Sequence, residues 1–470
     1  MNRRTYMDGG KAHHRSGTAA ALPQAVCTLG TAPHRLPVLG HALALRNSPL
    51  EFLASLPKHG DLVAIGLGPS TAYVTCDPEL SHLVLRDSTA FDKGGPLIEQ
   101  AAKILGDGLA TCPRQAHRRQ RRLIQPAFVA ERIAEYAQAM PSSIAAVMGS
   151  WRDGQVIDAL QAMTDIASRV TAHTIFSAVP ERTMDEFGEC ITITFDGFYK
   201  QMTSPLPFLK RLPTPANKRY MQARSRMDQI VSDTITQYRN SKNAPHGDLL
   251  SMLLAAHDGQ GDTLSEQEVH DQVITFFIGG IETAASLLAW ALHLLGRHPH
   301  IRQRLHSEVD EVLDGNPASW DDIPRLGLTT RILTETMRLY PPGPLFTRVT
   351  TAETELGGHT FPAGTDIVYS AYIVHHLPEI YPSPHLFDPD RWLPGTPPPP
   401  RGAYIPFGGG ARKCIGDSFA MAEATLALST IAARFDLEPD PRVLVKPMVR
   451  TTLRPDLLPM RLHARTPRRP

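Results

Sequence analysis

The longest stretch of helical periodicity lies in the middle of the chain. Residues 101–299 are mostly amphipathic segments with few glycines or prolines and short connections, which is typical of packed helices. Residues 349–371 instead place β-branched residues around Gly-Gly and Pro-Ala-Gly turns, and residues 62–76 read as another short sheet. The pattern therefore predicts a mainly α-helical body with small β-sheets.

One helical segment is much longer than the others. Ser265 followed three residues later by Glu268 is the pattern of a capping box, so a helix is expected to begin there. Nearly thirty residues of helical pattern follow, about 45 Å at 1.5 Å per residue. Their apolar part approaches the length of a membrane span, but glycines and polar residues such as Ser286 and His293 interrupt it. We therefore expect a central buried helix.

The two ends of the chain lack a clear period. Residues 1–33 are rich in Gly, Ala, His, Arg and Thr, and their apolar run is too short to span a bilayer. They are predicted to form a mobile N-terminal tail, and residues 464–470 a loose C-terminal tail. Residues 34–463 between them are predicted to form a single catalytic domain.

Charge and cysteine content narrow the class of protein. The 470 residues include 48 Lys and Arg against 47 Asp and Glu, a net charge of +1 that gives no reason to expect nucleic acid or a membrane surface as partner. The cysteines are scattered, odd in number and without a C-x-x-C pair, which argues against a disulfide framework and a zinc knuckle and favours a reducing cytoplasm. They are Cys27, Cys76, Cys112, Cys190 and Cys414.

The sequence FGGGARKCIGDS, residues 407–418, places a single cysteine in a flexible and cationic loop. A helical pattern follows Gly416, so Cys414 is expected at or just before a helix N-terminus, where the dipole favours a thiolate. Glycines at 408–410 allow positive φ and close approach to a ligand, and Arg412 adds a cation. Haem, with an axial thiolate and carboxylates to neutralise, fits this description. For such a cysteine taken alone, a buried and inert role is the alternative.

The spacing F-x-x-G-x-R-x-C-x-G closely resembles the haem-binding motif of the cytochrome P-450 (haem-thiolate monooxygenase) family. Its positions are Phe407, Gly410, Arg412, Cys414 and Gly416. Other family landmarks follow in the right order, so the resemblance covers the chain from about Pro37 onward. It implies the cytochrome P-450 fold, a triangular helical body with a long helix over the haem. It also implies heme b (iron protoporphyrin IX) with Cys414 as metal ligand, and cofactor contacts from Phe407, Arg412 and Gly416.

A second landmark is TETMRLYPPGPLFTR, residues 334–348. Glu335 and Arg338 are three residues apart and share one helix face. Taken alone they would be an ordinary surface pair, worth less than about 1 kcal/mol. In the family such a pair locks with an arginine of a later coil, here Arg391 in FDPDRW, and the three hold the cysteine loop in place. Arg348 follows at the position that, by resemblance, reaches a haem propionate.

The stretch GGIETA in the long helix resembles the oxygen-activation motif of the family, with Glu282 and Thr283 as the catalytic acid and alcohol. Thr275, Gly279 and Thr283 are spaced to line one stripe. Glycine in mid-helix is unfavourable by about 1 kcal/mol, which suggests a local opening for oxygen and water. Close helix packing on small residues is the alternative. Ala284 stands where Thr or Ser is common, a departure that removes neither the acid nor the alcohol.

The fourth landmark is RQAHRRQRRLIQPAF, residues 114–128. His117 and Arg121 lie one turn apart, and by resemblance they meet the propionates, with His117 where many relatives have Trp. Arg118, Arg119 and Arg122 would then turn elsewhere, toward an acidic partner. A solvated basic face or a nucleic-acid patch is the alternative, although no second basic cluster or aromatic platform supports nucleic acid.

The reaction that the resemblance implies is insertion of one oxygen atom from O2 into a C–H bond of a lipophilic small molecule. The chain has no dinucleotide-binding pattern and no cluster-spaced cysteines, so electrons from NAD(P)H are expected through an external ferredoxin (or flavodoxin) and its reductase. A cytoplasmic monomer without stable membrane insertion is expected. A haem-thiolate isomerase, dehydratase or coupling enzyme and a haem sensor are the alternatives. Retention of Glu282 and Thr283 argues against both.

The substrate is expected to meet bulky apolar groups. The candidate contacts are Leu97, Ile98, Thr275, Phe276, Gly279, Leu345 and Phe346. Lys93 and Lys103 are the nearest cations, and either could bind the carboxylate of a fatty acid or point to solvent. The loop after Phe91, LPTPANKRY and the HRRQRR helix are similar to bacterial sesquiterpene-oxidising members of the family, such as the pentalenene oxygenases. This favours a terpene of secondary metabolism, with fatty acids and polyketides as alternatives.

Overall fold

The computed structural model describes residues 27–177, 179–202, 212–240, 247–257 and 261–466. The helices are α1 Ala42–Asn47, α2 Pro49–Ser55, α3 Pro78–Arg86, α4 Gly95–Leu105, α5 Arg114–Ile124, α6 Ala130–Ala137, α7 Met140–Met148, α8 Ala159–Ile175, α9 Glu181–Met202, α10 Pro215–Asn240, α11 Leu249–Ala255, α12 Glu266–Arg297, α13 Pro299–Leu313, α14 Gly327–Leu339, α15 Ala371–His375 and α16 Asp417–Arg434. The strands are β1 Leu29–Thr31, β2 Leu62–Leu67, β3 Ser70–Thr75, β4 Phe91–Asp92, β5 Val156–Asp158, β6 Phe346–Thr350, β7 Thr354–Leu356, β8 His359–Phe361, β9 Asp366–Tyr369, β10 Phe435–Pro439, β11 Pro447–Val449, β12 Leu453–Pro455 and β13 Pro459–Ala464.

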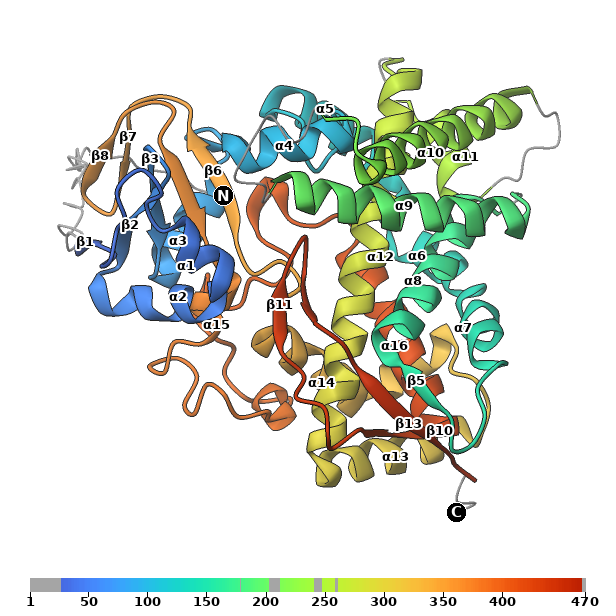
Figure 1. Ribbon diagram of the computed structural model, residues 1–470. Coiled ribbons are helices and arrows are strands. Elements are labelled where there is room, and N and C mark those ends of the chain that lie inside the picture. Colours follow the sequence, from blue (N-terminus) through green and yellow to red (C-terminus); the bar gives the residue numbers. More distant parts are fainter. Residues whose placement is uncertain (1–26, 178, 203–211, 241–246, 258–260, 467–470) are drawn as a thin grey trace, which may run out of the picture.

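Two hydrophobic cores divide the described chain into a helical body and a smaller sheet region. The larger core gathers buried side chains from α6–α8, α12, α14 and α16, and the smaller one from β2, β3, β9, α3 and α15. Figure 1 shows the sheet region at the left and the helices at the right, with α12 running through the helical body. This arrangement is the mainly helical fold with small sheets that the periodicity predicted.

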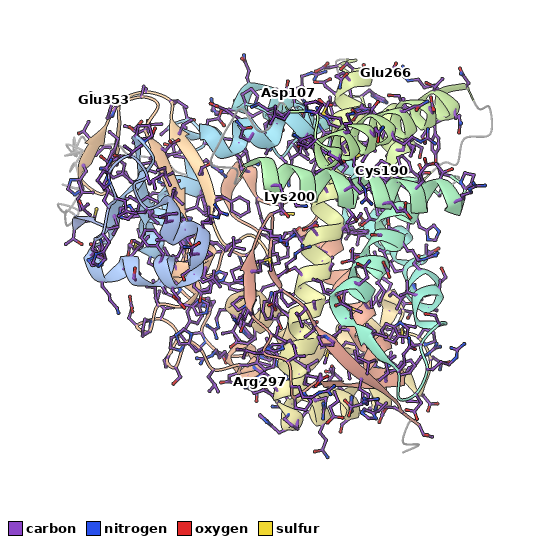
Figure 2. All side chains as sticks on the ribbon, viewed as in Figure 1. Asp107, Cys190, Lys200, Glu266, Arg297 and Glu353 are labelled. Atoms are coloured by element: carbon purple, nitrogen blue, oxygen red, sulfur yellow. The ribbon has the colours of Figure 1, made fainter. Side chains whose placement is uncertain are left out.

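The central helix α12 begins where the capping box predicted. Ser265 Oγ accepts the Glu268 backbone N–H at 3.2 Å, and the Glu268 carboxylate accepts the Ser265 N–H at 2.8 Å. The helix continues without interruption to Arg297, and Figure 2 labels its two ends at Glu266 and Arg297. It is long and apolar enough to cross a bilayer, but 67% of its most apolar window is buried inside the fold, as expected for a central helix.

The main sheet has the strand order β1-β2-β3-β9-β6-β4. Its first strand, β1, runs parallel to β2 with Leu29 opposite Leu62. The boundary of the N-terminal tail, predicted at residue 33, therefore lies beyond the start of the sheet. At the other end, Ala464 pairs with Phe435, and Arg465 forms an ion pair with Asp310 at 2.9 Å, so the ordered chain passes the predicted limit at residue 463. Residues 1–26 and 467–470 of the two predicted tails lie outside the described residues.

Both predicted β regions are confirmed. β2 and β3 form an antiparallel pair within residues 62–76. Residues 349–371 contain the β7–β8 hairpin, whose turn is made by Gly357 and Gly358 with φ of +61° and +82°. The predicted helical stretch needs one correction, because the short strand β5 interrupts it and pairs with β13. That strand is three residues long, too short to show a two-residue period in the sequence.

Candidate active site

The cysteine loop folds back against α3. Gly408 and Gly410 have φ of +67° and +62°, as predicted for this glycine run, whereas Gly409 is extended. A Cβ on Gly410 would overlap the carbonyl oxygen of Leu85, so the close approach that this glycine permits is to protein backbone rather than to a ligand. The Cys414 backbone N–H donates to the Phe407 carbonyl at 2.9 Å and closes the loop.

Cys414 lies just before α16, whose N-cap is Gly416, as predicted. Its side chain is solvent-accessible, yet it lies inside the molecule, where burial raises the pKa of the thiol. A hydrogen bond from the Gly416 backbone and the cations Arg121 and Lys93 act in the opposite direction and do not outweigh burial. The backbone hydrogen bond therefore favours the thiolate, as predicted for the start of a helix, while burial outweighs it. A bound metal ion would supply the missing positive charge, since a coordinating thiol is deprotonated outright.

Basic side chains from several elements collect beside this cysteine. Lys93 follows β4, Arg348 lies on β6, His117 on α5 and Arg412 in the cysteine loop. Arg412 pairs with Asp92 at 2.6 Å. Burial, and then repulsion by Arg348 and Arg412, lowers the pKa of Lys93 to about 7. Burial, with Arg412 and Lys93 nearby, lowers the pKa of His117 to about 3.

The positive charge of this cluster exceeds its negative charge. Among the described residues, neither Lys93 nor Arg348 forms an ion pair with a carboxylate, and the buried Nε of Arg412 has no hydrogen-bond partner. A haem would bring the two propionates that such a cluster needs and an iron for Cys414. The residues therefore fit the group: Cys414 would ligate the iron, and Lys93, Arg348, Arg412 and His117 would hold the propionates.

Lys93 is the member that the sequence did not identify as a cofactor contact. Its Nζ donates to the Ala110 carbonyl at 2.5 Å, and its neighbours are arginines. Lysine is usually exposed, so the sequence alone favoured solvent or a substrate carboxylate. The antiparallel pairing of β4 with β6 sets Asp92 opposite Val349, and so brings Lys93 near Arg348. That pairing is visible only in the folded chain.

Arg121 contacts the cysteine loop directly. Its Nη1 donates to the Lys413 carbonyl at 2.8 Å, and its Nε to Gln125 at 2.7 Å. The side chain therefore fixes the residue that precedes Cys414. Its predicted contact with a propionate stays a prediction.

Arg119 does not face an outside partner, contrary to the prediction. Its guanidinium pairs with Asp262 at 2.8 Å and with Glu268 at 2.6 Å, so it ties α5 to the start of α12. Arg122 lies 3.9 Å from the same Asp262. Arg118 is exposed, as predicted. The sequence did not reveal these partners because the acids lie about 145 positions away in the chain, and helix periodicity relates only neighbouring residues.

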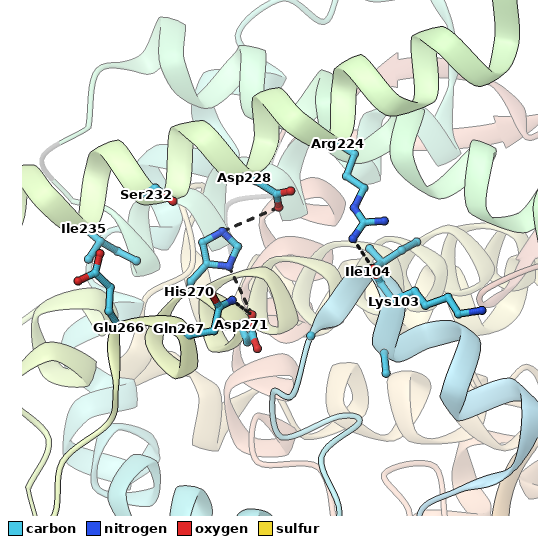
Figure 3. Close-up of a pocket in the computed structure, with 12 residues that line it drawn as sticks. Lys103, Ile104, Arg224, Asp228, Ser232, Ile235, Glu266, Gln267, His270 and Asp271 are labelled. Carbon is cyan, nitrogen blue, oxygen red and sulfur yellow. Dashed lines mark hydrogen bonds and ion pairs between the residues drawn. The ribbon is translucent and has the colours of Figure 1, made fainter. Parts of the chain in front are cut away.

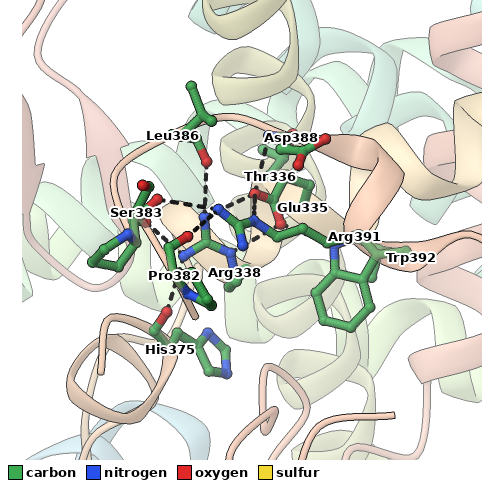
Figure 4. A network of polar contacts seen from close by, with 12 residues as sticks. Glu335, Thr336, Arg338, His375, Pro382, Ser383, Leu386, Asp388, Arg391 and Trp392 are labelled. Carbon is green, nitrogen blue, oxygen red and sulfur yellow. Dashed lines mark hydrogen bonds and ion pairs between the residues drawn. The ribbon is translucent and has the colours of Figure 1, made fainter. Parts of the chain in front are cut away.

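Glu335 and Arg338 are completely buried rather than on the surface. Figure 4 shows the network around them. Arg338 makes two hydrogen bonds to the Glu335 carboxylate, at 2.8 and 2.9 Å, and Arg391 approaches the same carboxylate at 3.5 Å, as predicted. Trp392 Nε1 donates to Glu335 at 2.8 Å, a partner that the sequence did not identify. Arg338 also donates to backbone carbonyls, those of His375, Pro384 and Leu386.

This network is connected to the cysteine loop through residues 403–405. The Ile405 backbone N–H donates to Nε2 of His375 at 2.9 Å, and the carbonyl of His375 accepts from Arg338. The Tyr404 hydroxyl donates to the Thr334 carbonyl, and the Tyr381 hydroxyl donates to the Ala403 carbonyl, both at 3.0 Å. The predicted structural role of the pair is therefore supported by a continuous chain of contacts.

The two glycines of α12 have different surroundings. A Cβ on Gly280 would meet the Thr171 side chain at 2.8 Å, so this glycine permits close helix packing. A Cβ on Gly279 would meet nothing within 4 Å, so this position faces open space. The Thr283 hydroxyl donates to the Gly279 carbonyl at 2.6 Å. The helix is continuous here, so the expected local opening is not seen. Of the predicted stripe, Gly279 and Thr283 are accessible, whereas Thr275 is buried.

Glu282 turns away from Thr283 toward the β11–β12 hairpin. One carboxylate oxygen accepts hydrogen bonds from Thr451 at 3.0 Å and Thr452 at 3.3 Å. The other lies 3.9 Å from the Arg454 guanidinium. The predicted acid and alcohol are thus adjacent in the helix but are held by different partners.

Several predicted substrate contacts are taken up by packing. Thr275 is buried against Gly108, Phe276 packs on Phe128 with ring centroids 5.3 Å apart, and Phe346 stacks on Tyr369 at 5.7 Å. Leu345 packs against the core of the sheet region, and Ile98 is half-buried on α4. The side chain of Leu97 lies outside what the structure describes. Gly279 faces open space and Phe346 is partly exposed, and all of these substrate contacts stay predictions.

A charged cavity lies at the junction of α4, α10 and α12 (Figure 3). Its volume is about 450 Å³. His270 lies between two carboxylates, 3.8 Å from Asp228 of α10 and 3.4 Å from Asp271 of its own helix. The cavity lining includes Lys103 and none of the motif residues, so this cavity is distinct from the cysteine site.

Three comparisons place the chain among known proteins. The family model described as Cytochrome P450 matches residues 31–460. Cyclooctat-9-en-7-ol 5-monooxygenase of Streptomyces melanosporofaciens is 48% identical over 426 residues, which cover 90% of this chain and 92% of that protein. Pentalenene oxygenase of Streptomyces avermitilis is 46% identical over 449 residues, or 95% of this chain and 100% of that protein.

The fold also matches a solved structure. The heme domain of cytochrome P450DA superposes with a TM-score of 0.84 at 27% sequence identity, and the match covers 94% of this chain and 99% of that chain. The agreement extends over the helical body and the sheet region together.

Proposed function

The chain belongs to the cytochrome P450 family and is a cytochrome P450 monooxygenase, and from this premise we propose that it oxidises a cyclic terpene. Two relatives that share nearly half of its residues are named for oxidation of cyclooctat-9-en-7-ol and of pentalenene. Identity is spread over at least 90% of the chain in both comparisons. The haem of this family supplies the oxygen chemistry when bound, and the chain supplies its ligand, its pocket and its protons.

The surroundings of Lys93 are the observation that carries the choice of a hydrocarbon over a fatty acid. A fatty acid needs a fixed cation for its carboxylate. Lys93 belongs to the cluster beside Cys414 and donates to a backbone carbonyl. Lys103 is exposed and donates to Gln100. Neither of the two cations considered for a carboxylate faces an apolar site, which favours a substrate recognised by shape and apolar area.

Proton supply is assigned to the stripe of α12 at Gly279–Thr283. Thr283 presents a hydroxyl at the accessible part of the helix, and Glu282 carries an ionisable group beside it. A hydroxyl that can both donate and accept is suited to pass a proton, and a carboxyl is suited to deliver it. These roles separate the proposal from a haem-thiolate isomerase, which needs neither group.

An external protein donates the electrons in this proposal, a ferredoxin with its reductase. The exposed Arg118 lies on α5, the helix whose Arg121 holds the carbonyl of Lys413 next to Cys414. An acidic partner on this face would therefore dock close to the cysteine. Arg118→Glu should slow reduction in stopped-flow measurements, more strongly at low salt. Equal rates at every salt concentration would move the docking site elsewhere.

A titration of the purified holoenzyme tests the substrate. The panel contains pentalenene, cyclooctat-9-en-7-ol, a long-chain fatty acid and a macrolactone, and the signal is the shift of the haem band to high spin. We expect a shift with at least one terpene and a hydroxylated product on turnover with a surrogate ferredoxin. A shift with the fatty acid alone would overturn the terpene assignment.

A further inference from the structure

The turn of the β11–β12 hairpin is attached to one stripe of α12. Ser286 and Trp290 both donate to the backbone carbonyl of Leu453, at 2.5 and 2.9 Å. Glu282, one turn earlier, accepts from the hydroxyls of Thr451 and Thr452. Positions 282, 286 and 290 are spaced at i, i+4 and i+8, so they lie on one face of the helix. The hairpin turn is therefore held along three successive turns of α12.

The three attachments differ in strength. Ser286, Trp290 and Leu453 are buried, and Trp290 also stacks on Tyr340 with ring centroids 3.9 Å apart. The Glu282 contact is longer, and its side chain is 19% exposed. The first two attachments fix the backbone of the hairpin, while the third is the one that involves an ionisable group. Thr452 is buried and Thr451 half-buried, so their hydroxyls have few alternative partners in water.

We propose that Thr451 and Thr452 are positioning residues that hold the Glu282 carboxylate for proton delivery, and that Arg454 assists them. The hydroxyls donate to one carboxylate oxygen, and the arginine stands near the other. Without these donors, the carboxylate would be free to change rotamer at a position that is only partly exposed. The inference rests on the proposed role of Glu282 as proton donor. It adds that a segment about 170 positions away in the chain sets the orientation of that donor.

The arrangement links the hairpin to the chemistry of α12. In Figure 1 β11 rises toward α9, and its partner strand β12 contacts α12. A displacement of the turn would move the two hydroxyls away from Glu282 while leaving Thr283 bound to the Gly279 carbonyl. The Glu282 carboxylate would then lose its partners without any change in the helix. The position of the hairpin is thereby coupled to the supply of protons.

A pair of isosteric exchanges tests the hydroxyls. Thr451→Val with Thr452→Val retains the methyl groups and removes both donors, whereas Thr451→Ser with Thr452→Ser retains the donors. With pentalenene as substrate, product per NADPH should fall about tenfold in the valine variant, which is the lower end of the range for loss of an orienting partner. In the serine variant it should be close to the wild-type value. Hydrogen peroxide should rise in parallel, and the solvent isotope effect should increase. Thr360→Val, an exposed threonine of the β7–β8 hairpin, is the control.

A second measurement does not depend on turnover. Glu282→Ala should increase hydrogen exchange in the holoenzyme peptide 447–455, whereas Thr360→Val should not. If exchange is unchanged, the carboxylate does not hold the hairpin and the inference is overturned. A fall of product per NADPH in the serine variant but not in the valine variant would also overturn the inference, since lost methyl packing would then be the cause.

The outcome for Glu282 separates this inference from the proposed function. If Glu282→Gln leaves product per NADPH unchanged, the carboxyl is not the proton donor and the proposed function of that residue fails. If Glu282→Gln lowers the ratio while the valine variant does not, the donor is confirmed and the positioning by the hairpin is wrong.

Discussion

The charged network beneath the cysteine loop and the charged contacts at the start of α12 are built differently. In the first, Glu335 and Arg338 are fully buried. Glu335 accepts a further hydrogen bond from Trp392, and Arg338 donates further hydrogen bonds to backbone carbonyls. In the second, Arg119 and Asp262 are about one-third exposed, and His270 lies between carboxylates that face a cavity. One region fixes a loop in a single position, and the other joins helices by contacts that solvent can replace.

The difference follows from desolvation. A buried ion pair is stable only when its remaining donors and acceptors are satisfied, so removing one partner leaves an uncompensated charge. A half-exposed pair loses little when it breaks, because water solvates both groups. We therefore expect the same type of substitution to have very different consequences in the two regions.

The largest effect is expected for Arg338→Ala. It would leave the Glu335 carboxylate buried with Arg391 at 3.5 Å as its remaining cation, so the free energy of unfolding should fall by about 3–5 kcal/mol. Denaturant unfolding of the holoenzyme measures the change, with haem release as a second signal. Arg338→Lys, which keeps the charge but loses the paired geometry, should fall between the wild type and Arg338→Ala. A loss near that of a surface pair would abolish the distinction drawn between the regions.

Lys93→Met sharpens the comparison inside the buried region, because stability and function should change in opposite directions. The folded pKa of about 7 lies below the ordinary lysine value of 10.5, so the wild-type apo-protein loses stability as the pH falls through this interval. The methionine variant should lack this loss and be the more stable apo-protein at pH 7. It should also release haem faster to apomyoglobin, by about tenfold, as expected for one lost bond to a charged group. Identical haem release would remove Lys93 from the propionate cluster.

Arg119→Ala is the matched exchange at the start of α12. It breaks the contacts to Asp262 and Glu268, both partly exposed, and should lower the free energy of unfolding by about 1 kcal/mol. The difference from wild type should shrink as salt is raised, since exposed pairs are screened. A decrease as large as that of Arg338→Ala would show that exposure does not govern these contacts.

The smallest effect is expected for His270→Asn. The acids Asp228 and Asp271 outweigh burial and raise the pKa of His270, with Glu266, Lys103 and Arg224 also lining the cavity. A raised folded pKa means that the contact is fully stabilising below about 6.5, the ordinary histidine value, and weakens as the pH rises through the folded pKa. The protection of α10 against hydrogen exchange, measured relative to the intrinsic exchange rate at each pH, should therefore decrease from pH 6 to pH 8 in the wild type. In His270→Asn this protection should be the same at both values.

The sequence by itself determined the features that depend on neighbouring residues. The capping box at Ser265 and Glu268, the turn at Gly357 and Gly358, and the position of Cys414 before α16 each involve groups a few positions apart. Local backbone preferences and helix spacing are sufficient for such features. The cysteine motif and the E-x-x-R pair were recognisable for the same reason, since the residues of each lie within a short stretch of the chain.

Only the tertiary structure decided which charges meet. Arg412 finds Asp92 across 320 positions, and Glu282 finds Thr451 across 169. Lys93 became a cofactor candidate and Arg119 an internal contact through neighbours that no local period encodes. The same is true of the Cys414 thiol, whose pKa is set by burial more than by the helix N-terminus. The charge state of a side chain depends on the groups folded against it, and chain spacing does not specify those groups.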